Sequence, residues 1–290
     1  MRTLWRLITL PFRLLFRLTK AIAGWIGRTF TEIRSFFADE PDDAPVADAL
    51  NKVIDNPTGV LEHLDALRKH LTRAVIFLAV TTALAFFFFE PIMGLLARPL
   101  EGGIEALVAI EVTEPIGTVM RVSLLTGFAL AFPYIALELW MFIAPGLSRR
   151  SRLYGLFAIP VATLFFLGGM AFAYFVMLPT ALPFLLNFMG IQTIPRPSSY
   201  VKFVTSLMFW IGVAFQFPLV IFVLAKVGLV KAKMLREQWR LAVVIMAVAA
   251  ALITPTVDPV NMALVMAPML VLYLLSIFLA KIAEPKETGA

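Results

Sequence analysis

Residues 74–97 read AVIFLAVTTALAFFFFEPIMGLLA, a long and almost uncharged apolar run. Sixteen residues pass without a charge before Glu90. A helix needs about 20 predominantly apolar residues to cross the hydrocarbon core of a bilayer. The run is continuous, whereas the strands of a membrane barrel alternate between apolar and polar residues. It therefore predicts a membrane-spanning helix over residues 74–93.

Five further apolar runs follow, so the sequence predicts an all-α integral membrane protein with six transmembrane helices. The six runs cover residues 74–93, 119–143, 153–178, 201–227, 241–253 and 262–279. The fifth would be only about 20 Å long at 1.5 Å per residue, so the bilayer or neighbouring helices must compensate for the mismatch. Several of the 19 prolines fall within the runs. They predict bent helices in a concave bundle.

Composition excludes several classes of protein. The chain is 60% hydrophobic and 15% charged, against about a quarter charged in soluble domains. It contains no cysteine and two histidines, which excludes disulfides and thiolate sites and argues against a metal site. The common catalytic motifs of hydrolases, zinc proteases and nucleotide-binding enzymes are absent from the sequence. We expect neither an enzyme nor a cofactor, and the net charge of +6 does not indicate a nucleic-acid partner in a chain this apolar.

Basic residues predict the orientation. They gather before the first run, in the loops after the second and fourth runs, and after the sixth; the clearest are Arg149, Arg150, Arg152, Lys231, Lys233, Arg236, Arg240, Lys281 and Lys286. The intervening loops are acidic. By the positive-inside rule both termini are cytoplasmic, and we expect a multi-pass protein of the cytoplasmic membrane.

Four segments are predicted along the chain. Residues 1–37 place six Lys and Arg side chains on one helical face, which is typical of a basic amphipathic helix on an anionic lipid surface. Residues 38–57 form an acidic flexible linker. The six-span domain covers residues 58–282, and residues 283–290 form a cytoplasmic tail.

Few polar side chains lie inside the runs, and each is a candidate for function. Glu138 could be solvated, paired with Arg149 or Arg150, or functional. Gln216 could form an interhelical hydrogen bond or contact a partner. Glu90 is expected at the membrane interface.

Just before the first span, residues 61–71 read LEHLDALRKHL. On a helix Leu61, Leu64, Leu67 and Leu71 form an apolar stripe, and Asp65 can pair with Lys69 at i,i+4. The segment is either an amphipathic entry to the span or part of a binding surface.

Several motifs, in order along the chain, resemble the TatC family. They are HLDALRKHL, ARPL, LWMFIAPGLSRR, GMAFAYFVMLPTALPFLLNF, FQFPL and ITPTVDPVNMALVMAPML, from residue 63 to residue 270. TatC is the multispanning receptor of the twin-arginine translocase, which exports folded proteins. The resemblance covers residues 57–282 and implies six spans with cytoplasmic termini.

The resemblance also implies a site. In TatC proteins the segment before the first span and the loop between the second and third spans bind the twin-arginine signal peptide. Here these are residues 61–73 and 144–153. The candidate signal-peptide-binding residues are Glu62, His63, Asp65, Arg68, Glu138, Phe142, Pro145, Arg149 and Arg150.

Further positions match the family elsewhere. Gln216 and Tyr174 are candidates for contact with partners within the membrane. Pro99 and Asp258 match periplasmic positions, where they could equally shape a loop or cap a helix.

The chain departs from the family at three carboxylates. The family pattern HLxELRxRL has a glutamate where this chain has Ala66, and further glutamates where it has Ser151 and Gln216. Carboxylates bind guanidinium groups best. We expect Glu62, Asp65 and Glu138 to provide the replacement negative charge.

Family membership would imply twin-arginine signal peptides of folded cargo and single-span TatA- and TatB-type proteins as partners, with transport driven by the proton-motive force. An oligomer is expected. Two alternatives remain open: a TatC paralogue with a structural or assembly role that has lost signal-peptide binding, and a small-solute transporter, which the absence of an evident inverted repeat disfavours.

Overall fold

The computed structural model describes residues 57–144, 149–187, 193–254 and 259–284, with the helix backbone alone for 57–62 and 149–154. The predicted N-terminal helix, the linker, Pro145, Asp258 and the tail after Glu284 lie outside the described residues. Contacts divide the chain into two units. The first includes residues 57–60 and 143–154, and the second comprises residues 61–142 and 155–290.

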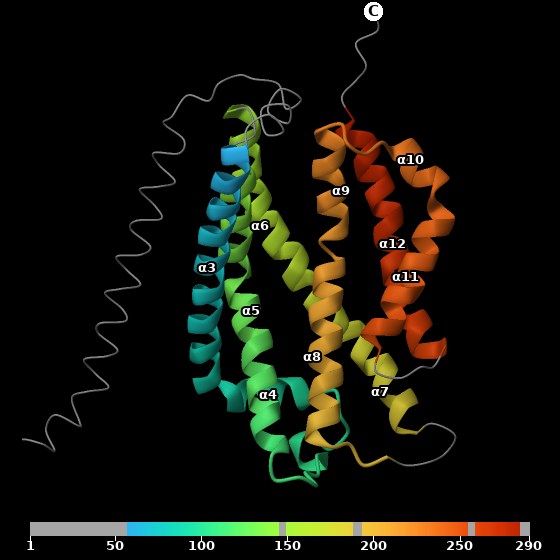
Figure 1. The fold of residues 1–290 in the computed structure, drawn as a ribbon. Helices are drawn as coiled ribbons and strands as arrows, with labels where there is room; N and C mark the ends of the chain where they lie inside the picture. The colour runs from blue at the N-terminus through green and yellow to red at the C-terminus, as the bar shows by residue number, and fades with distance from the viewer. Residues whose placement is uncertain (1–56, 145–148, 188–192, 255–258, 285–290) are drawn as a thin grey trace, which may run out of the picture. The chain divides into compact units, whose positions relative to one another are not determined.

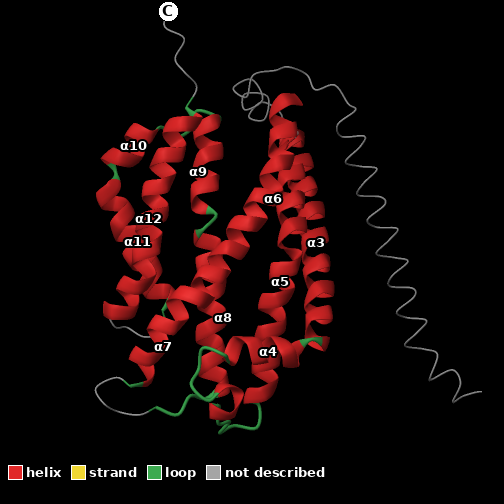
Figure 2. Ribbon diagram, turned by 180° about the vertical axis from the view of Figure 1, so that it is seen from behind, coloured by secondary structure: helices red, strands yellow, loops and turns green. Residues whose placement is uncertain are grey.

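The described residues are helical, with no strand among them (Figure 2). In chain order the long helices are α3 (Pro57–Phe87), α5 (Glu114–Ile143), α6 (Arg149–Phe172), α8 (Pro197–Ala214) and α12 (Pro259–Ala283). Shorter helices between them are α4 (Phe89–Ala97), α7 (Leu178–Leu186), α9 (Phe217–Lys226), α10 (Ala232–Glu237) and α11 (Trp239–Ile253). A 3₁₀ turn at Gly103–Ala106 and a π-helical turn at Ala173–Met177 complete the set.

Among the described residues, five helical segments are long and apolar enough to cross a membrane. They are His63–Phe87, Glu114–Ile143, Gly155–Leu186, Pro197–Lys226 and Pro259–Ala283. The remaining predicted span corresponds to α11, which has 15 residues and is therefore about 22 Å long. Each predicted apolar run is thus helical over most of its length, and the fifth is short as expected.

The first predicted span is wrong at its end. It was expected to continue to Met93, but α3 ends at Phe87, and Phe88 leaves the helical region at φ −106° and ψ 20°. The new helix α4 then runs across the end of α3 and α5 (Figure 1). Pro91 lacks the N–H that would continue the hydrogen-bond ladder, and its ring clashes with the carbonyl one turn earlier.

Proline also interrupts the fourth segment. Helix α8 ends at Ala214, Gln216 precedes α9, and Pro218 occupies the first turn of α9. In the third segment the π-helical turn comes immediately before α7, which has Pro179 in its first turn. These breaks agree with the bending that the prolines predicted.

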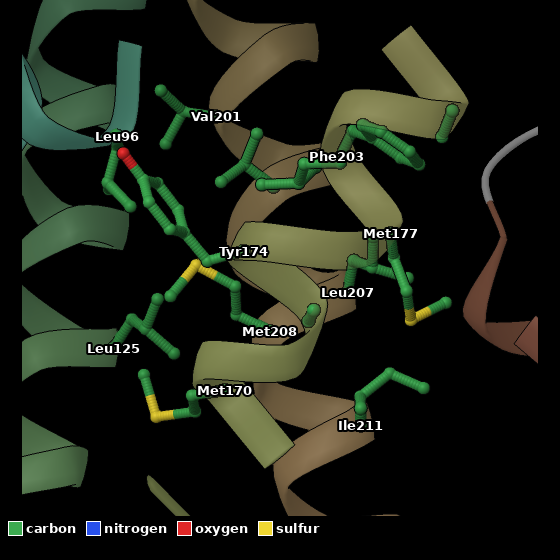
Figure 3. Packing of buried hydrophobic residues seen from close by; sticks show 14 of the residues in the cluster. Leu96, Leu125, Met170, Tyr174, Met177, Val201, Phe203, Leu207, Met208 and Ile211 are labelled. Atoms are coloured by element: carbon green, nitrogen blue, oxygen red, sulfur yellow. The ribbon is translucent and has the colours of Figure 1, made fainter. Parts of the chain in front are cut away.

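The hydrophobic core of the second unit lies where α5, α6, α7 and α8 meet (Figure 3). Phe132 and Phe166 stack with ring centroids 4.3 Å apart. A Cβ added to Gly169 would lie 2.8 Å from the Cα of Gly212, so the backbones of α6 and α8 approach closely there. Small residues at such crossings let helices pack without large side chains between them.

Candidate functional site

The polar end of α3 is exposed. Asp65 forms the predicted ion pair with Lys69, at 3.2 Å, and the side chains of His63, Asp65 and Arg68 are accessible. Leu64, Leu67 and Leu71 are exposed as well. The leucine stripe therefore does not attach this part of α3 to its neighbours within the described residues.

The opposite, histidine-bearing face of α3 packs on α5. His63, His70 and Phe77 are spaced seven residues apart, which places them on one face of a helix. They meet Phe142, Glu138 and Tyr134, which are spaced four apart on α5. We call these six residues the α3–α5 seam. Figure 1 shows the two helices side by side.

Each pair in the seam makes a specific contact. The rings of His63 and Phe142 stack with centroids 4.4 Å apart, and those of Phe77 and Tyr134 lie 4.5 Å apart. Between them, His70 Nδ1 lies 2.6 Å from Glu138 Oε2. Further along, Thr81 Oγ1 donates to the carbonyl oxygen of Gly127 at 2.8 Å. The seam thus runs antiparallel over four turns and more of α3.

Glu138 is the most deeply buried acid of the candidate site, with 1% of its surface exposed. One carboxylate oxygen is bonded to His70, and the other accepts a hydrogen bond from the Tyr134 hydroxyl. It is therefore neither solvated nor turned toward the exposed acids of α3. A buried carboxylate requires such partners, because desolvation of an unpaired charge is costly.

The sequence contains one signal for this pairing. Two histidines seven residues apart share a helical face, and Glu138 is the only acid in the second apolar run, so a histidine is a candidate partner beside Arg149 and Arg150. The spacing alone could not identify Glu138 as that partner, because the pairing depends on how α3 and α5 cross.

The second half of the predicted site is only partly described. Phe142 is half-buried in the seam. Arg149, Arg150 and Ser151 lie in the first turn of α6, and their side chains, like those of Glu62 and Pro145, are outside the described residues.

Gln216 forms an interhelical hydrogen bond, which was one of the two expectations for it. Its amide Nε2 donates to the carbonyl oxygen of Ala162 in α6 at 2.8 Å. The amide therefore connects the break between α8 and α9 to α6.

Tyr174 is buried, and its hydroxyl forms a hydrogen bond within the protein. Its hydroxyl donates to the carbonyl oxygen of Leu95 at 2.7 Å, and the Tyr200 hydroxyl donates to that of Leu96 at the same distance. Figure 3 shows Tyr174 among Leu96, Val201 and Met208. The last carbonyls of a helix have few partners within it, and the two tyrosine hydroxyls bond to carbonyls at the end of α4, about one turn before half-buried Pro99.

An ion-pair network at the start of α8 was not predicted. Arg196 Nε donates to Glu114 Oε1 at 2.8 Å, and its Nη2 donates to Glu111 Oε1 at 2.9 Å and also to Glu114. These bonds, chiefly that with Glu114, raise the pKa of Arg196 above its ordinary value. The network joins the beginnings of α5 and α8.

Within the described residues, no group of three or more His, Cys, Asp or Glu side chains could hold a metal ion. The exposed polar end of α3 presents charges of both signs on a helix fixed by the seam. Such a surface can recognise a charged segment of another chain.

A family model described as Sec-independent protein translocase protein (TatC) matches residues 62–268. Among curated proteins, the TatC protein of Carboxydothermus hydrogenoformans is 34% identical over 235 residues, which cover 80% of this chain and 97% of that protein. The TatC protein of Aquifex aeolicus is also 34% identical, over 78% of this chain and 96% of its own length.

A solved structure described as the crystal structure of the twin arginine translocase receptor TatC has the same fold. It superposes with a TM-score of 0.69 at 32% sequence identity, covering 76% of this chain and 99% of that one. The similarity therefore extends over nearly all of that structure and about three quarters of this chain.

Proposed function

Because the chain belongs to the TatC family of Sec-independent protein translocase proteins, we propose that it is the receptor that binds the twin-arginine signal peptide of folded cargo. The proposed signal-peptide-binding residues are those that the family implies, within residues 61–73 and 144–153. The similar solved structure is itself described as a twin arginine translocase receptor.

The seam carries this proposal. A peptide-binding surface gains affinity when it is rigid before the ligand arrives. His63, His70 and their partners hold one face of α3 on α5, while Asp65 and Arg68 remain accessible on the other side. The position of the polar end is thus fixed while Asp65 and Arg68 stay available to the peptide.

Glu62 and Asp65 would supply the carboxylates that are absent at Ala66 and Ser151. Asp65 is exposed and its partner Lys69 is a surface cation, and such pairs are worth little. An arginine of the signal peptide can therefore displace Lys69 at small cost. Glu138 would act differently, by holding the seam and by adding negative charge behind the surface.

The remaining features of the proposal follow from the family. The helix α11 would be the fifth of six spans, both termini would face the cytoplasm, and the 1–37 segment would lie on anionic lipid. TatA- and TatB-type proteins would assemble around the spans as an oligomer, with Gln216 and Tyr174 near partner contacts and Pro99 and Asp258 on the periplasmic side. Transport would use the proton-motive force.

Peptide binding tests the proposal directly. A labelled twin-arginine peptide is titrated onto the full chain in nanodiscs, beside a twin-lysine peptide. Substitution Glu62→Gln with Asp65→Asn should weaken twin-arginine binding about tenfold or more, since hydrogen bonds to charged groups are worth about 1.5–3 kcal/mol. Adding Glu138→Gln should weaken it further. Ala66→Glu should strengthen it.

The matched control neutralises Glu101 and Glu105, which are exposed acids near the 3₁₀ turn. That variant should bind the peptide as the parent does. Unchanged affinity after neutralisation of Glu62, Asp65 and Glu138 together would contradict the proposed site.

The absent carboxylates also support one alternative, a TatC paralogue with a structural or assembly role. This chain would then bind neither peptide, even with Ala66→Glu, while still co-purifying with TatA- or TatB-type proteins. The same titration, followed by a pull-down of those partners, separates the two functions.

A further inference from the structure

A basic elbow joins α9 to α11 and is unrelated to the seam. We define it as Lys226, Lys231, Lys233, Arg236, Arg240 and Lys281. These cations lie on α9, α10, α11 and the end of α12, and their side chains are exposed. Figures 1 and 2 show α10 at the end of the unit where α9 stops and α11 starts.

The elbow has few acids to balance it. Within residues 226–284 as described, the acids are Glu237 and Glu284. Glu237 makes a long ion pair with Lys233 at 3.8 Å. Glu284 Oε1 accepts a hydrogen bond from the backbone N–H of Ala232 at 2.5 Å. Its carboxylate therefore caps the N-terminus of α10 and does not pair with a cation of the elbow in this contact. The outer face is left strongly positive.

Helix α10 is held in place at both ends. Besides the Glu284 cap, the Tyr273 hydroxyl of α12 donates to the carbonyl oxygen of Leu235. A helix of six residues would not be stable alone. Its attachment to α12 therefore presents Lys233 and Arg236 in a fixed position instead of on a mobile loop.

Large apolar side chains are exposed among these cations. Trp239 is 53% exposed and Leu229 is 70% exposed, and the Arg240 guanidinium lies 5.7 Å from the Trp239 ring centroid. Tryptophan beside basic residues is typical of the boundary between lipid headgroups and acyl chains. If the elbow bound an acidic protein segment in water, the exposed Trp239 and Leu229 side chains would have no apolar partner. A lipid bilayer provides one.

We propose that the basic elbow binds the phosphates of anionic phospholipids, with Trp239 and Leu229 inserted at the acyl boundary. Clusters of four to eight Lys and Arg beside a membrane helix are attracted to anionic lipid. The bound lipids would also accommodate α11, which at about 22 Å is shorter than the hydrocarbon core. The inference does not depend on signal-peptide binding.

The absence of cysteine from the sequence permits a local measurement. A fluorophore is attached to a single cysteine introduced by Met234→Cys in α10 of the full chain. Nanodiscs contain phosphatidylglycerol and phosphatidylcholine in equal amounts. A nitroxide quencher near the head of the acyl chain is carried either by the first lipid or by the second. The mixture is the same in both samples, so the ratio of quenching reports which lipid lies next to α10.

We expect severalfold stronger quenching from labelled phosphatidylglycerol, because each cation near the surface favours anionic lipid by about fivefold. The triple variant Lys233→Gln, Arg236→Gln, Arg240→Gln removes the three cations nearest the label and should lower the ratio severalfold. The matched control neutralises Arg98, Arg121 and Lys202, which are exposed elsewhere, and should leave the ratio unchanged. The N-terminal basic segment is identical in all samples.

Equal quenching by the two lipids in the parent chain would overturn the proposal, as would a ratio that survives in the triple variant. A ratio that changes only when the acidic residues 38–48 are neutralised would indicate that an acidic protein segment occupies the elbow instead. Unaltered elution of the triple variant in size-exclusion chromatography, together with unaltered twin-arginine peptide binding, verifies that it is folded.

Discussion

His70 and Glu138 are separated by 68 residues in sequence, yet His70 Nδ1 lies 2.6 Å from Glu138 Oε2. The side chain of His70 is 21% exposed, whereas that of Glu138 is 2% exposed. The imidazole thus connects a buried carboxylate to the edge of the bundle. At the family position corresponding to His70, the pattern HLxELRxRL has arginine, so this chain retains a basic residue there of a different shape.

Substitution His70→Leu should destabilise the protein by about 2 kcal/mol or more, because it leaves the Glu138 carboxylate buried without its imidazole partner. Thermal unfolding in detergent measures the effect. The double variant His70→Leu, Glu138→Leu should be more stable than the single variant, since no charge is then orphaned. A double variant no better than the single one would show that the pair is not the source of the loss.

Gly127→Ala should separate α3 from α5. A Cβ at Gly127 would lie 2.5 Å from the Cα of Thr82, and backbone cannot rotate away as a side chain can. We expect a loss of about 1–3 kcal/mol, measured by thermal unfolding. Gly168→Ala is the control, because a Cβ there meets nothing within 4 Å and alanine favours helix by up to about 1 kcal/mol. Equal destabilisation of both variants would contradict the close approach.

The Arg196 network predicts an order of effects. Arg196→Gln should lower the melting temperature more than Glu111→Gln, because Glu114 is buried and would lose its partner, whereas the Glu111 side chain is 66% exposed. Arg196→Lys should be intermediate, since an ammonium group cannot reproduce the planar donor geometry of guanidinium. A melting temperature that falls as far in Glu111→Gln as in Arg196→Gln would argue against this explanation.

Gln216→Glu restores the family residue but removes a donor. The Gln216 amide donates to a carbonyl oxygen, and an ionised carboxylate has no hydrogen to donate. We expect a loss of about 1 kcal/mol at neutral pH that shrinks at acid pH, where a protonated carboxyl group can donate. Melting curves at the two pH values, with Gln216→Met as a variant that cannot titrate, provide the check.

Tyr174→Phe and Tyr200→Phe should each cost about 0.5–1.5 kcal/mol, the usual net value of one hydrogen bond. Both hydroxyls bind the end of α4, so we expect faster proteolysis or hydrogen exchange at Leu95–Leu100 than at α12. Exchange that rises equally in both regions would indicate global unfolding instead of release of α4.

The helical class and the positions of the apolar runs could be predicted because burial in lipid is a property of each segment by itself. The Asp65–Lys69 pair is likewise local, four residues along one helix, and is confirmed. The end of the first span was not predictable from apolarity: Phe88 and Phe89 are as apolar as the residues before them, and the turn depends on Pro91.

The candidate site was predicted as a list of positions, and the structure adds their pairing. Whether Glu138 meets Arg149, water or His70 depends on the crossing of two helices far apart in sequence. The Arg196 network has the same character, since it joins residues more than 80 positions apart. Such pairs follow from the packing of the bundle, which the periodicity of a single helix does not contain.

The close approach of Gly127 to Thr82 also restricts how this sequence can evolve. A larger residue at position 127 is acceptable only if position 82 shrinks or α3 moves outward, so the two positions should vary together among descendants of this chain. Because α3 carries His63 and Asp65 at its far end, a substitution at Gly127 that shifts α3 would also shift these polar side chains. Selection on recognition would then act on a residue that never meets the ligand.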